Sequence, residues 1–415
     1  MYTLLIHLYG AAMRLAANFH KKANDWVVGR RSVWTDIAKL KNDARPVFWL
    51  HAASLGEFEQ GRPILEAWRT QYGDTHKIIV TFFSPSGYNV RKNYPLADVV
   101  TYLPLDTPEN ARRFIQIVQP TTVVFVKYEF WYHILTETFK TKADVYLVSA
   151  SFRPQQFLFK WYGASFLSLL HGFRQIFVQK PEHLALLQQY NVKNAQVAGD
   201  TRLDRSVQVA EKTPSLPLIA HFIKGRTTLI AGSTWQPDEN VLLPITQNTQ
   251  FSDWCFILAP HEIKSENIKA LQQRFGANTI LYSELVAQNG AESSKNILII
   301  DNIGLLAALF KYANYAYIGG AFSNGLHNII EAAVFGVPIF FGNKNYKKFP
   351  ESSDLIHENG AFAISESQEL SAQLTFFRKN NTAYLSACAN NKRYVLENAG
   401  ATEQILAAIT KDSAS

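Results

Sequence analysis

An acidic side chain follows an apolar run near the start of the chain. In HAASLGEFEQG, residues 51–61, Ser54 and Glu57 come directly after PVFWL, a run typical of a buried strand. Their spacing fits a capping box, in which the serine caps a helix and the glutamate bonds back to the serine amide. Loops that follow strands of a parallel sheet also carry the chemistry of α/β proteins, so Glu57 is a candidate for a chemical role. His51, nearby, is the alternative, or a residue that braces the loop.

A glycine pair marks a second candidate site. In YIGGAFSNGLHNIIEAAVFGVPIFFG, residues 317–342, a strand runs into Gly319-Gly320 and a helix is predicted from about His327-Asn328. Glycines let a backbone approach a ligand closely, and the first amides of a helix attract anions. Glu331, one turn into that helix, can accept hydrogen bonds from a ribose diol. The segment therefore suits a sugar nucleotide, although a plain packing turn has the same letters.

Three further loops of the second half follow apolar runs. Serine and threonine can donate to phosphate or cap a helix, and a glycine loop gives a flat base a place against the backbone. These residues are Ser233 and Thr234 in AGSTW, Pro260 and His261 in LAPHE, and Ile303, Gly304 and Leu305 in IDNIGLL. Each loop alone is an ordinary connection, but together at one sheet edge they predict a pocket.

Short apolar runs alternate with amphipathic stretches, which predicts parallel sheets covered by helices on both faces. Thr107 and Pro108 are typical of a helix start. The alternation pauses at residues 211–226 and then restarts, so we expect two domains, 31–211 and 212–415, with the last helix able to return to the first. The runs are PVFWL, KIIVTFF, DVVTYLPL, TTVVFV, ADVYLVSA, RQIFVQ and AQVAG, then TTLIAG, WCFILA, NTILY, NILII, YAYIGG and VPIFFG.

The composition limits the classes of function. The 415 residues are 47% hydrophobic and 18% charged, which excludes wholesale disorder. Two cysteines and no Cys/His cluster of zinc spacing predict neither a disulfide framework nor a metal site. The net charge of +7 comes without a long basic run, so we expect no nucleic-acid partner but an anionic one, such as a phosphorylated substrate or an acidic membrane.

The first 30 residues are apolar and then basic. MYTLLIHLYGAAMRLAANF is followed by HKK and GRR, the reverse of the order in a secretory signal. The uninterrupted apolar stretch is shorter than the ~20 residues that a spanning helix needs. We interpret residues 1–30 either as a membrane-associated helix with a cytoplasmic basic flank or as an amphipathic helix docked on its own domain.

With these residues in view, the chain resembles the transferases of 3-deoxy-D-manno-octulosonic acid (Kdo), which attach this sugar to lipid A. The resemblance covers nearly the whole chain. It rests on HAASLGE (51–57), TFFSPSG (81–87), KYEFW (127–131) and GDTRLD (199–204), and on GSTW, PHE, GG and HNIIE of the second half.

The resemblance implies a GT-B glycosyltransferase with two Rossmann-like domains facing across a cleft. CMP-Kdo would be the donor, held by the second domain, and a lipid A precursor (lipid IVA) would be the acceptor, at the cytoplasmic face of the inner membrane. Transfer would be inverting and independent of metal or cofactor. Glu57 matches the general base of the family, and Glu129 and Arg202 match positions that stabilise the transition state.

The resemblance also assigns binding residues in both domains. Besides the loops above, the donor set includes Asn328, Ile329, Ile330 and Glu331. The expected acceptor set is Ser54, Gly56, Thr81, Ser84, Ser86 and Gly87. The hydroxyl groups of Thr81, Ser84 and Ser86 fit a turn and a helix cap equally well.

Two other functions stay open. One is a GT-B transferase that uses a UDP-sugar, and the other is a nucleotide-sugar or lipid A binding protein without catalysis. The sequence does not indicate the number of Kdo units, the acyl preference or the oligomeric state.

Overall fold

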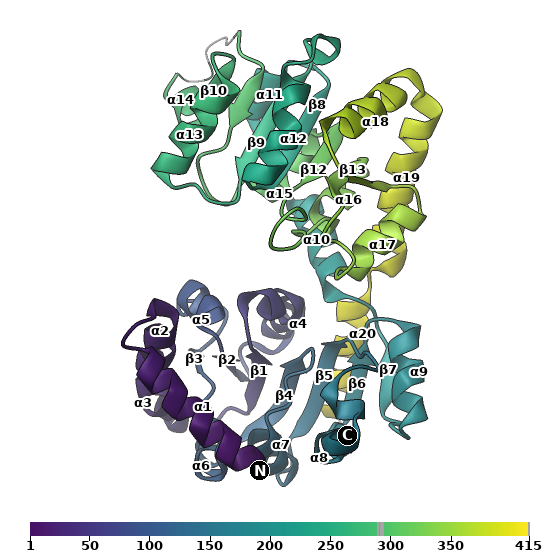
Figure 1. Ribbon diagram of the computed structural model, residues 1–415. Coiled ribbons are helices and arrows are strands. Elements are labelled where there is room, and N and C mark those ends of the chain that lie inside the picture. The colour runs from purple at the N-terminus through teal and green to yellow at the C-terminus, as the bar shows by residue number, and fades with distance from the viewer. Residues whose placement is uncertain (289, 291–293, 414–415) are drawn as a thin grey trace. The chain divides into compact units, whose positions relative to one another are not determined.

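The computed structural model describes residues 1–288, 290 and 294–413 (Figure 1). The chain divides into two units. The first comprises residues 1–204 together with the segment that begins at Ala399, and the second comprises residues 205–398. Each unit contains a seven-stranded sheet in which all the strand pairs are parallel. The prediction of two parallel-sheet α/β domains is confirmed.

The first sheet has the strand order β3-β2-β1-β4-β5-β6-β7. The chain therefore starts in the middle, builds one half of the sheet and then crosses to the other half at the β1–β4 pair. The strands are β1 (Val47–Ala52), β2 (Lys77–Phe82), β3 (Val99–Tyr102), β4 (Pro120–Val126), β5 (Asp144–Ala150), β6 (Gln175–Val178) and β7 (Ala195–Val197).

Helices cover both faces of this sheet because its strands are apolar on both faces. α3, α6, α7 and α9 pack on one face, and α4 and α20 pack on the other. The helices are α1 (Tyr2–Ala16), α2 (Lys21–Gly29), α3 (Val33–Ala38), α4 (Leu55–Tyr72), α5 (Pro85–Arg91), α6 (Pro108–Val118), α7 (Tyr132–Phe139), α8 (Ala164–Leu167), α9 (Pro181–Gln189), α10 (Thr201–Lys212) and α20 (Ala401–Ser413).

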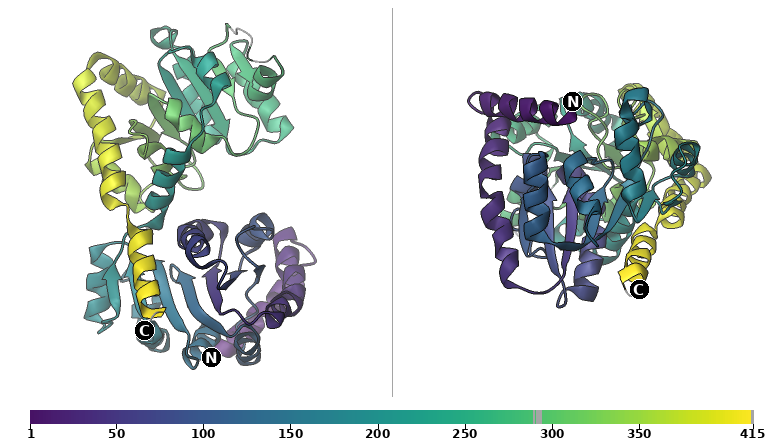
Figure 2. Two further views of the ribbon diagram at one scale, coloured as in Figure 1. Left: turned by 180° about the vertical axis from the view of Figure 1, so that it is seen from behind. Right: turned by 90° about the horizontal axis from the view of Figure 1, so that it is seen from below.

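Residues 1–30 are part of the first unit. Of the two interpretations of this segment, the structure shows the helix docked on its own domain, and contact with a membrane stays a prediction. The Tyr2 hydroxyl donates to Asp106 at 2.6 Å, and Ile6 and Gly10 are buried on the same face of α1. Figure 2 shows α1, in dark purple, at the outside of this unit. No helix among the described residues is long and apolar enough to cross a bilayer.

The second sheet has the order β10-β11-β9-β8-β12-β13-β14. Its strands are β8 (Thr228–Thr234), β9 (Cys255–Pro260), β10 (Thr279–Leu281), β11 (Ile297–Ile299), β12 (Tyr315–Ile318), β13 (Ile339–Gly342) and β14 (Ala361–Ile364). Its helices are α11 (Pro217–Ile223), α12 (Gln236–Thr246), α13 (Ser265–Phe275), α14 (Tyr282–Ala287), α15 (Leu306–Leu309), α16 (Ile330–Ala333), α17 (Pro350–His357), α18 (Ser367–Lys379) and α19 (Asn381–Asn398).

The predicted strands are all present, and Thr107 caps α6 through its side chain. β14 was not predicted. The units divide between Asp204 and Arg205, inside α10, and not at residues 211–212. The last helix, α20, lies in the first unit, where Ile405 and Ile409 are fully buried beside α4 (Figure 1).

Candidate active site

The two acidic candidates follow β1 and β4, the neighbouring strands at which the strand order of the first sheet reverses. β1 leads into α4 on one face, and its neighbour β4 leads into α7 on the opposite face. The loops after the two strands separate at this point, and the crevice they leave is the preferred ligand site of open parallel sheets. Glu57 stands in the first turn of α4, and Glu129 lies in the loop after β4.

Ser54 caps α4, but its side chain does not bond to the helix amides. Its hydroxyl donates instead to Oε2 of Glu57 at 2.8 Å. The backbone capping box predicted from the sequence is therefore wrong in its bonding. The serine holds the carboxylate directly, which fixes the orientation of a group that must meet a substrate hydroxyl.

Burial raises the pKa of Glu57 above the ordinary glutamate value, and the charge of Glu129 raises it further. The Ser54 hydroxyl, Lys127 and His51 act in the opposite direction. A carboxylate with a raised pKa is a stronger base once it is ionised. The charge of Glu129 thus acts on the Glu57 carboxyl at the switch point of the sheet.

Trp131 connects Glu129 to His51 through its indole N–H. The Trp131 indole N–H lies 3.0 Å from both Oε2 of Glu129 and Nε2 of His51. The other ring nitrogen of His51, Nδ1, lies 2.8 Å from the Thr81 hydroxyl. His51 is fully buried with both nitrogens bonded. This arrangement favours bracing over catalysis.

Thr81 is also fully buried, in β2, and its oxygen accepts from Trp49 as well. The core encloses this hydroxyl, which gives no support to the predicted contact with the acceptor. Ser84 caps α5, as its alternative role predicted, and bonds to the exposed Ser86. Gly87 packs against Phe82, where a Cβ would approach ring atoms to 2.2 Å.

Open space surrounds Gly56, the residue before Glu57, since an added Cβ would meet no atom within 4 Å. Tyr128, from KYEFW, is half exposed. Burial raises the pKa of its phenol, and the charges of Glu57 and Glu129 raise it further. Sequence reasoning passed over Tyr128 and Trp131, although both follow a strand directly within a motif that it had noted.

Arg202 lies at the start of α10 and forms a bidentate ion pair. Its Nε and Nη2 atoms are 3.0 and 2.6 Å from Oδ2 of Asp200. Burial alone would raise the pKa of Asp200, but Arg202 and Lys127 hold it below the ordinary value. Lys127 has a left-handed backbone, with φ of 65°, a strained conformation typical of functional loops. Arg202 thus belongs to a charged cluster with Asp200 and Lys127.

The second unit repeats this design at the β8–β12 pair, its own switch point. The Gly319-Gly320 turn follows β12, and Ser233 and Thr234 end β8. A Cβ on Gly319 would lie 2.3 Å from the Ser233 carbonyl oxygen. Gly320 has φ of 96°, and its Cβ would lie 2.3 Å from the Gly325 carbonyl. Both glycines are required by the backbone geometry.

A buried carboxylate that the sequence did not single out holds this turn. Asp238 of α12 accepts from the amides of Gly320 and Trp235, at 2.9 and 3.0 Å, and from the Tyr317 hydroxyl at 3.1 Å. An acid three residues after a helix cap was the available signal. Asp238 ties the two loops of the switch point together.

Three rings form the wall beside the glycine turn. His261 stacks on Trp235 and on His327, with ring centres 4.6 and 4.5 Å apart. The Trp235 indole donates to Nε2 of His327 at 3.2 Å. Burial, aided by His261, lowers the pKa of His327 to about 4, so this ring is neutral at pH 7. The ring wall offers flat surfaces.

Glu331 is positioned differently from the expectation. The helix begins at Ile330 and has four residues, so Glu331 lies in its first turn and the predicted start at His327-Asn328 is wrong. The Asn328 amide donates to Oε1 of Glu331 at 3.0 Å. A helix this short makes no useful anion site. The segment therefore contributes the Asn328–Glu331 pair to the candidate donor site. Ile329 is buried behind it.

The loop after β11 reaches the same edge. Leu306, which follows the predicted Ile303, Gly304 and Leu305, packs so closely on Gly232 of β8 that a Cβ there would lie 2.8 Å away. Ile303 is 85% exposed. Pro260 ends β9, and the His261 amide donates to the Thr234 carbonyl. No group of metal-binding side chains occurs among the described residues.

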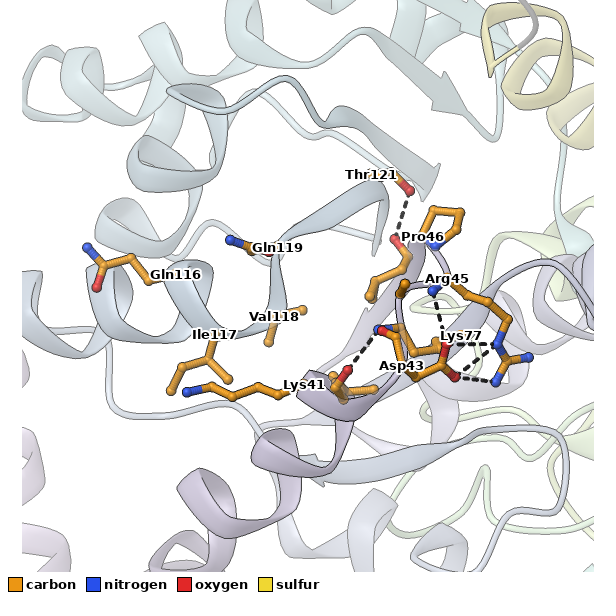
Figure 3. Close-up of a pocket in the computed structure, with 13 residues that line it drawn as sticks. Lys41, Asp43, Arg45, Pro46, Lys77, Gln116, Ile117, Val118, Gln119 and Thr121 are labelled. Carbon is orange, nitrogen blue, oxygen red and sulfur yellow. Dashed lines mark hydrogen bonds and ion pairs between the residues drawn. The ribbon is translucent and has the colours of Figure 1, made fainter.

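A pocket of about 650 Å³ lies at the opposite, amino-terminal edge of the first sheet (Figure 3). Three of its charged residues, Asp43, Arg45 and Lys77, are bonded to neighbouring protein atoms. Lys77 donates to the carbonyls of Leu40 and Asp43, and Arg45 forms an ion pair with the Asp43 carboxylate. The pocket is therefore separate from the acidic candidates at the carboxyl edge.

Comparison with known proteins supports the resemblance seen in the sequence. Residues 28–205 match the family model of 3-deoxy-D-manno-octulosonic-acid transferase. The Rickettsia felis transferase of that name is 27% identical over 377 residues, covering 89% of this chain and 80% of the relative. The Aquifex aeolicus enzyme is 25% identical over 341 residues, covering 81% and 87%. The chain is similar to the Kdo transferases over most of its length.

A Kdo transferase is a glycosyltransferase, so the prediction of this enzyme class is confirmed. In fold the chain is similar to the UDP-GlcNAc 2-epimerase of Neisseria meningitidis, with a TM-score of 0.63 at 14% identity, over 88% of this chain and all of the epimerase. This likeness concerns the fold alone. The family match covers residues 28–205, which include both acidic candidates as well as Asp200 and Arg202.

Proposed function

We propose that the chain transfers Kdo from CMP-Kdo to a lipid A precursor, as a step of lipopolysaccharide biosynthesis. The observation that supports this most is the pair Glu57 and Glu129 at the switch point of the unit that matches the family model. The curated relatives carry the name of this activity.

In the proposed reaction the acceptor hydroxyl attacks the anomeric carbon of Kdo and its proton passes to Glu57. The bond from that carbon to the CMP phosphate breaks with inversion, and CMP leaves with the bonding electrons. Glu129 keeps the pKa of Glu57 raised, which strengthens the base. Arg202 contributes positive charge, oriented by Asp200.

The donor would be held by the second unit. The Gly319-Gly320 turn allows a phosphate close to the backbone, and Glu331, fixed by Asn328, accepts from the ribose hydroxyls. The ring wall offers a surface for the base. These steps need no metal, because charge on the leaving phosphate can be balanced by fixed dipoles and cations.

We also propose that the enzyme works at the cytoplasmic surface of the inner membrane. Leu4, Leu5, Leu8 and Leu15 of α1 are exposed although the opposite face of the helix is docked. Residues 1–24 contain no acidic side chain but include Arg14, Lys21 and Lys22. An apolar helix face with a basic flank suits an anionic bilayer surface.

Aromatic residues extend this surface. Phe157, Trp161 and Tyr162 are exposed, and Phe166 contacts both Phe157 and Tyr2 of α1. Residues 145–181 contain no acidic side chain. Aromatic side chains with neighbouring basic groups favour the headgroup region of a bilayer.

A CMP-release assay tests the activity. CMP should appear from CMP-Kdo only when a lipid A precursor is present, and the product should carry Kdo. Release from a UDP-sugar in its place would make the chain a different GT-B transferase. Donor binding without release under any acceptor condition would make it a binding protein.

A further inference from the structure

A second, smaller pocket of about 250 Å³ lies beneath α1 in the first unit. Gly10 and Arg14 of α1, four residues apart and so on one helix face, form its upper side. Trp26 of α2, Arg30 and Trp34 line the rest together with the loop from β3 to α6. The described lining includes two arginines and no acidic side chain. Neither the sequence motifs nor the proposed transfer uses this pocket.

Arg30 is a partly buried cation whose described bonds go to neutral groups. It donates to the carbonyls of Leu103, Trp26 and Phe83, at 3.1, 3.1 and 2.8 Å. Its guanidinium also lies 3.7 Å from the centre of the Trp26 ring and 4.9 Å from that of Tyr102. These bonds use three of the five N–H groups of an arginine.

No carboxylate among the described residues bonds to this guanidinium. Burial lowers the pKa of Arg30 to about 9, and the groups that oppose the shift are the phenols of Tyr102 and Tyr9. A buried charge normally has an ionic partner, because the loss of hydration is otherwise uncompensated. An anion bound in the pocket would supply that partner.

Trp26 gives an independent indication of a ligand. Its indole N–H is buried and has no hydrogen-bond partner among the described residues, although Trp26 lines the pocket. A buried donor without an acceptor is destabilising. A ligand with acceptor oxygens would satisfy both this N–H and the remaining N–H groups of Arg30.

The volume of the pocket and its apolar lining indicate which kind of anion it can bind. The pocket is below the ~300–1,000 Å³ of sites that enclose a whole small molecule. Val27, Val33 and Leu105 give it apolar walls, and the exposed leucines of α1 lie on the same helix as Arg14. A charged headgroup whose apolar part continues into a bilayer meets both conditions.

We propose that this pocket binds the phosphate of an anionic membrane lipid, with Arg14 and Arg30 as the cations and Trp26 as a neutral donor. The inference rests on the proposed membrane location, which it deepens, but it does not depend on Kdo transfer. Bound lipid would fix α1 on the bilayer at a defined point and not merely by apolar contact.

The test uses the full chain and short-chain lipids that stay monomeric in water. Dihexanoyl phosphatidylglycerol should bind saturably, as followed by tryptophan fluorescence, and dihexanoyl phosphatidylcholine should bind at least tenfold more weakly. Arg14→Gln changes an exposed side chain and should weaken phosphatidylglycerol binding at least tenfold. Val27→Phe, which fills the pocket, should do the same. Arg31→Gln, an exposed arginine outside the lining, should bind like the parent chain.

Three results would overturn the proposal: no saturable binding of phosphatidylglycerol, equal binding by the Arg14→Gln and parent chains, or equal binding of inorganic phosphate, which would assign the pocket to a free anion. CMP release is measured in parallel with a detergent-dispersed acceptor. A pocket variant that loses lipid binding but releases CMP at the normal rate supports the lipid site and leaves the transfer proposal standing. A parent chain that binds lipid but never releases CMP contradicts the transfer proposal alone.

Discussion

Glu57, which accepts a hydrogen bond from Ser54, has two possible roles, as a cap of α4 and as the general base. If Glu57 served only to cap α4, Glu57→Gln would be nearly silent, because glutamine serves a capping box equally well. As the general base, the same change removes the proton acceptor, so we expect transfer to fall roughly 10²–10⁴-fold while the melting temperature hardly moves. Glu59→Gln, on the same helix but paired with Arg62 and Arg91, is the matched control and should keep its transfer rate. Near-normal transfer by Glu57→Gln would remove this residue from catalysis.

The pH profile provides a second test at the residue scale. Transfer requires ionised Glu57, whose pKa is raised first by burial and then by Glu129, so the rate should fall on acidification at a higher pH than an ordinary glutamate would give. Glu129→Gln removes one raising charge, and the acidic limb should then move to lower pH whatever happens to the maximal rate. An acidic limb that stays in place, measured as kcat against pH, would contradict the coupling of the two carboxylates.

Glu331 and Asn328 make a prediction about the donor. Glu331→Ala should raise the KM for CMP-Kdo roughly 10- to 150-fold, which corresponds to about 1.5–3 kcal/mol for hydrogen bonds to a charged group. Asn328→Ala should have a smaller effect in the same direction, because it only frees the carboxylate that Asn328 holds. Equal KM values in the parent and Glu331→Ala chains would place the ribose elsewhere.

At the scale of elements, Asp238 joins α12 to the ends of β8 and β12. Asp238→Ala would leave the amides of Gly320 and Trp235 and the Tyr317 hydroxyl without their acceptor. We expect the second unit to lose about 1–3 kcal/mol of unfolding free energy or more, and CMP binding to weaken with it. Calorimetry and CMP titration measure the two effects. Glu369→Ala, an exposed acid of α18, is the control and should change CMP binding little.

The sequence predicted the strands well because buried parallel strands read as unbroken apolar runs. It missed β14, where the run AFAI is only four residues long. The order of strands placed Glu57 and the glycine turn at switch points that no local pattern could identify. The side-chain hydrogen bonds could not be predicted from the sequence. The Ser54–Glu57 bond and the enclosure of Thr81 by Trp49 and His51 depend on tertiary packing.

For the whole molecule, the docked but apolar α1 predicts how the enzyme finds its acceptor. Leu4 and Leu8 are 63% and 57% exposed, so Leu4→Gln with Leu8→Gln should leave folding intact. Flotation with vesicles containing phosphatidylglycerol should decrease severalfold, because apolar area is lost from the bilayer contact. The matched control is Leu385→Gln with Leu396→Gln, equally exposed leucines of α19. Unchanged flotation of the α1 variant would contradict the membrane surface.

The return of α20 to the first unit has a consequence for the order of synthesis. The first unit has completed its sheet by β7, yet Ile405 and Ile409, which fill its core beside α4, are made after all of residues 205–398. At roughly 5–20 residues per second, translation of that stretch takes about 10–40 s. During this interval the apolar groove for α20 faces water on the nascent chain. The first unit therefore finishes folding only after the second has been translated.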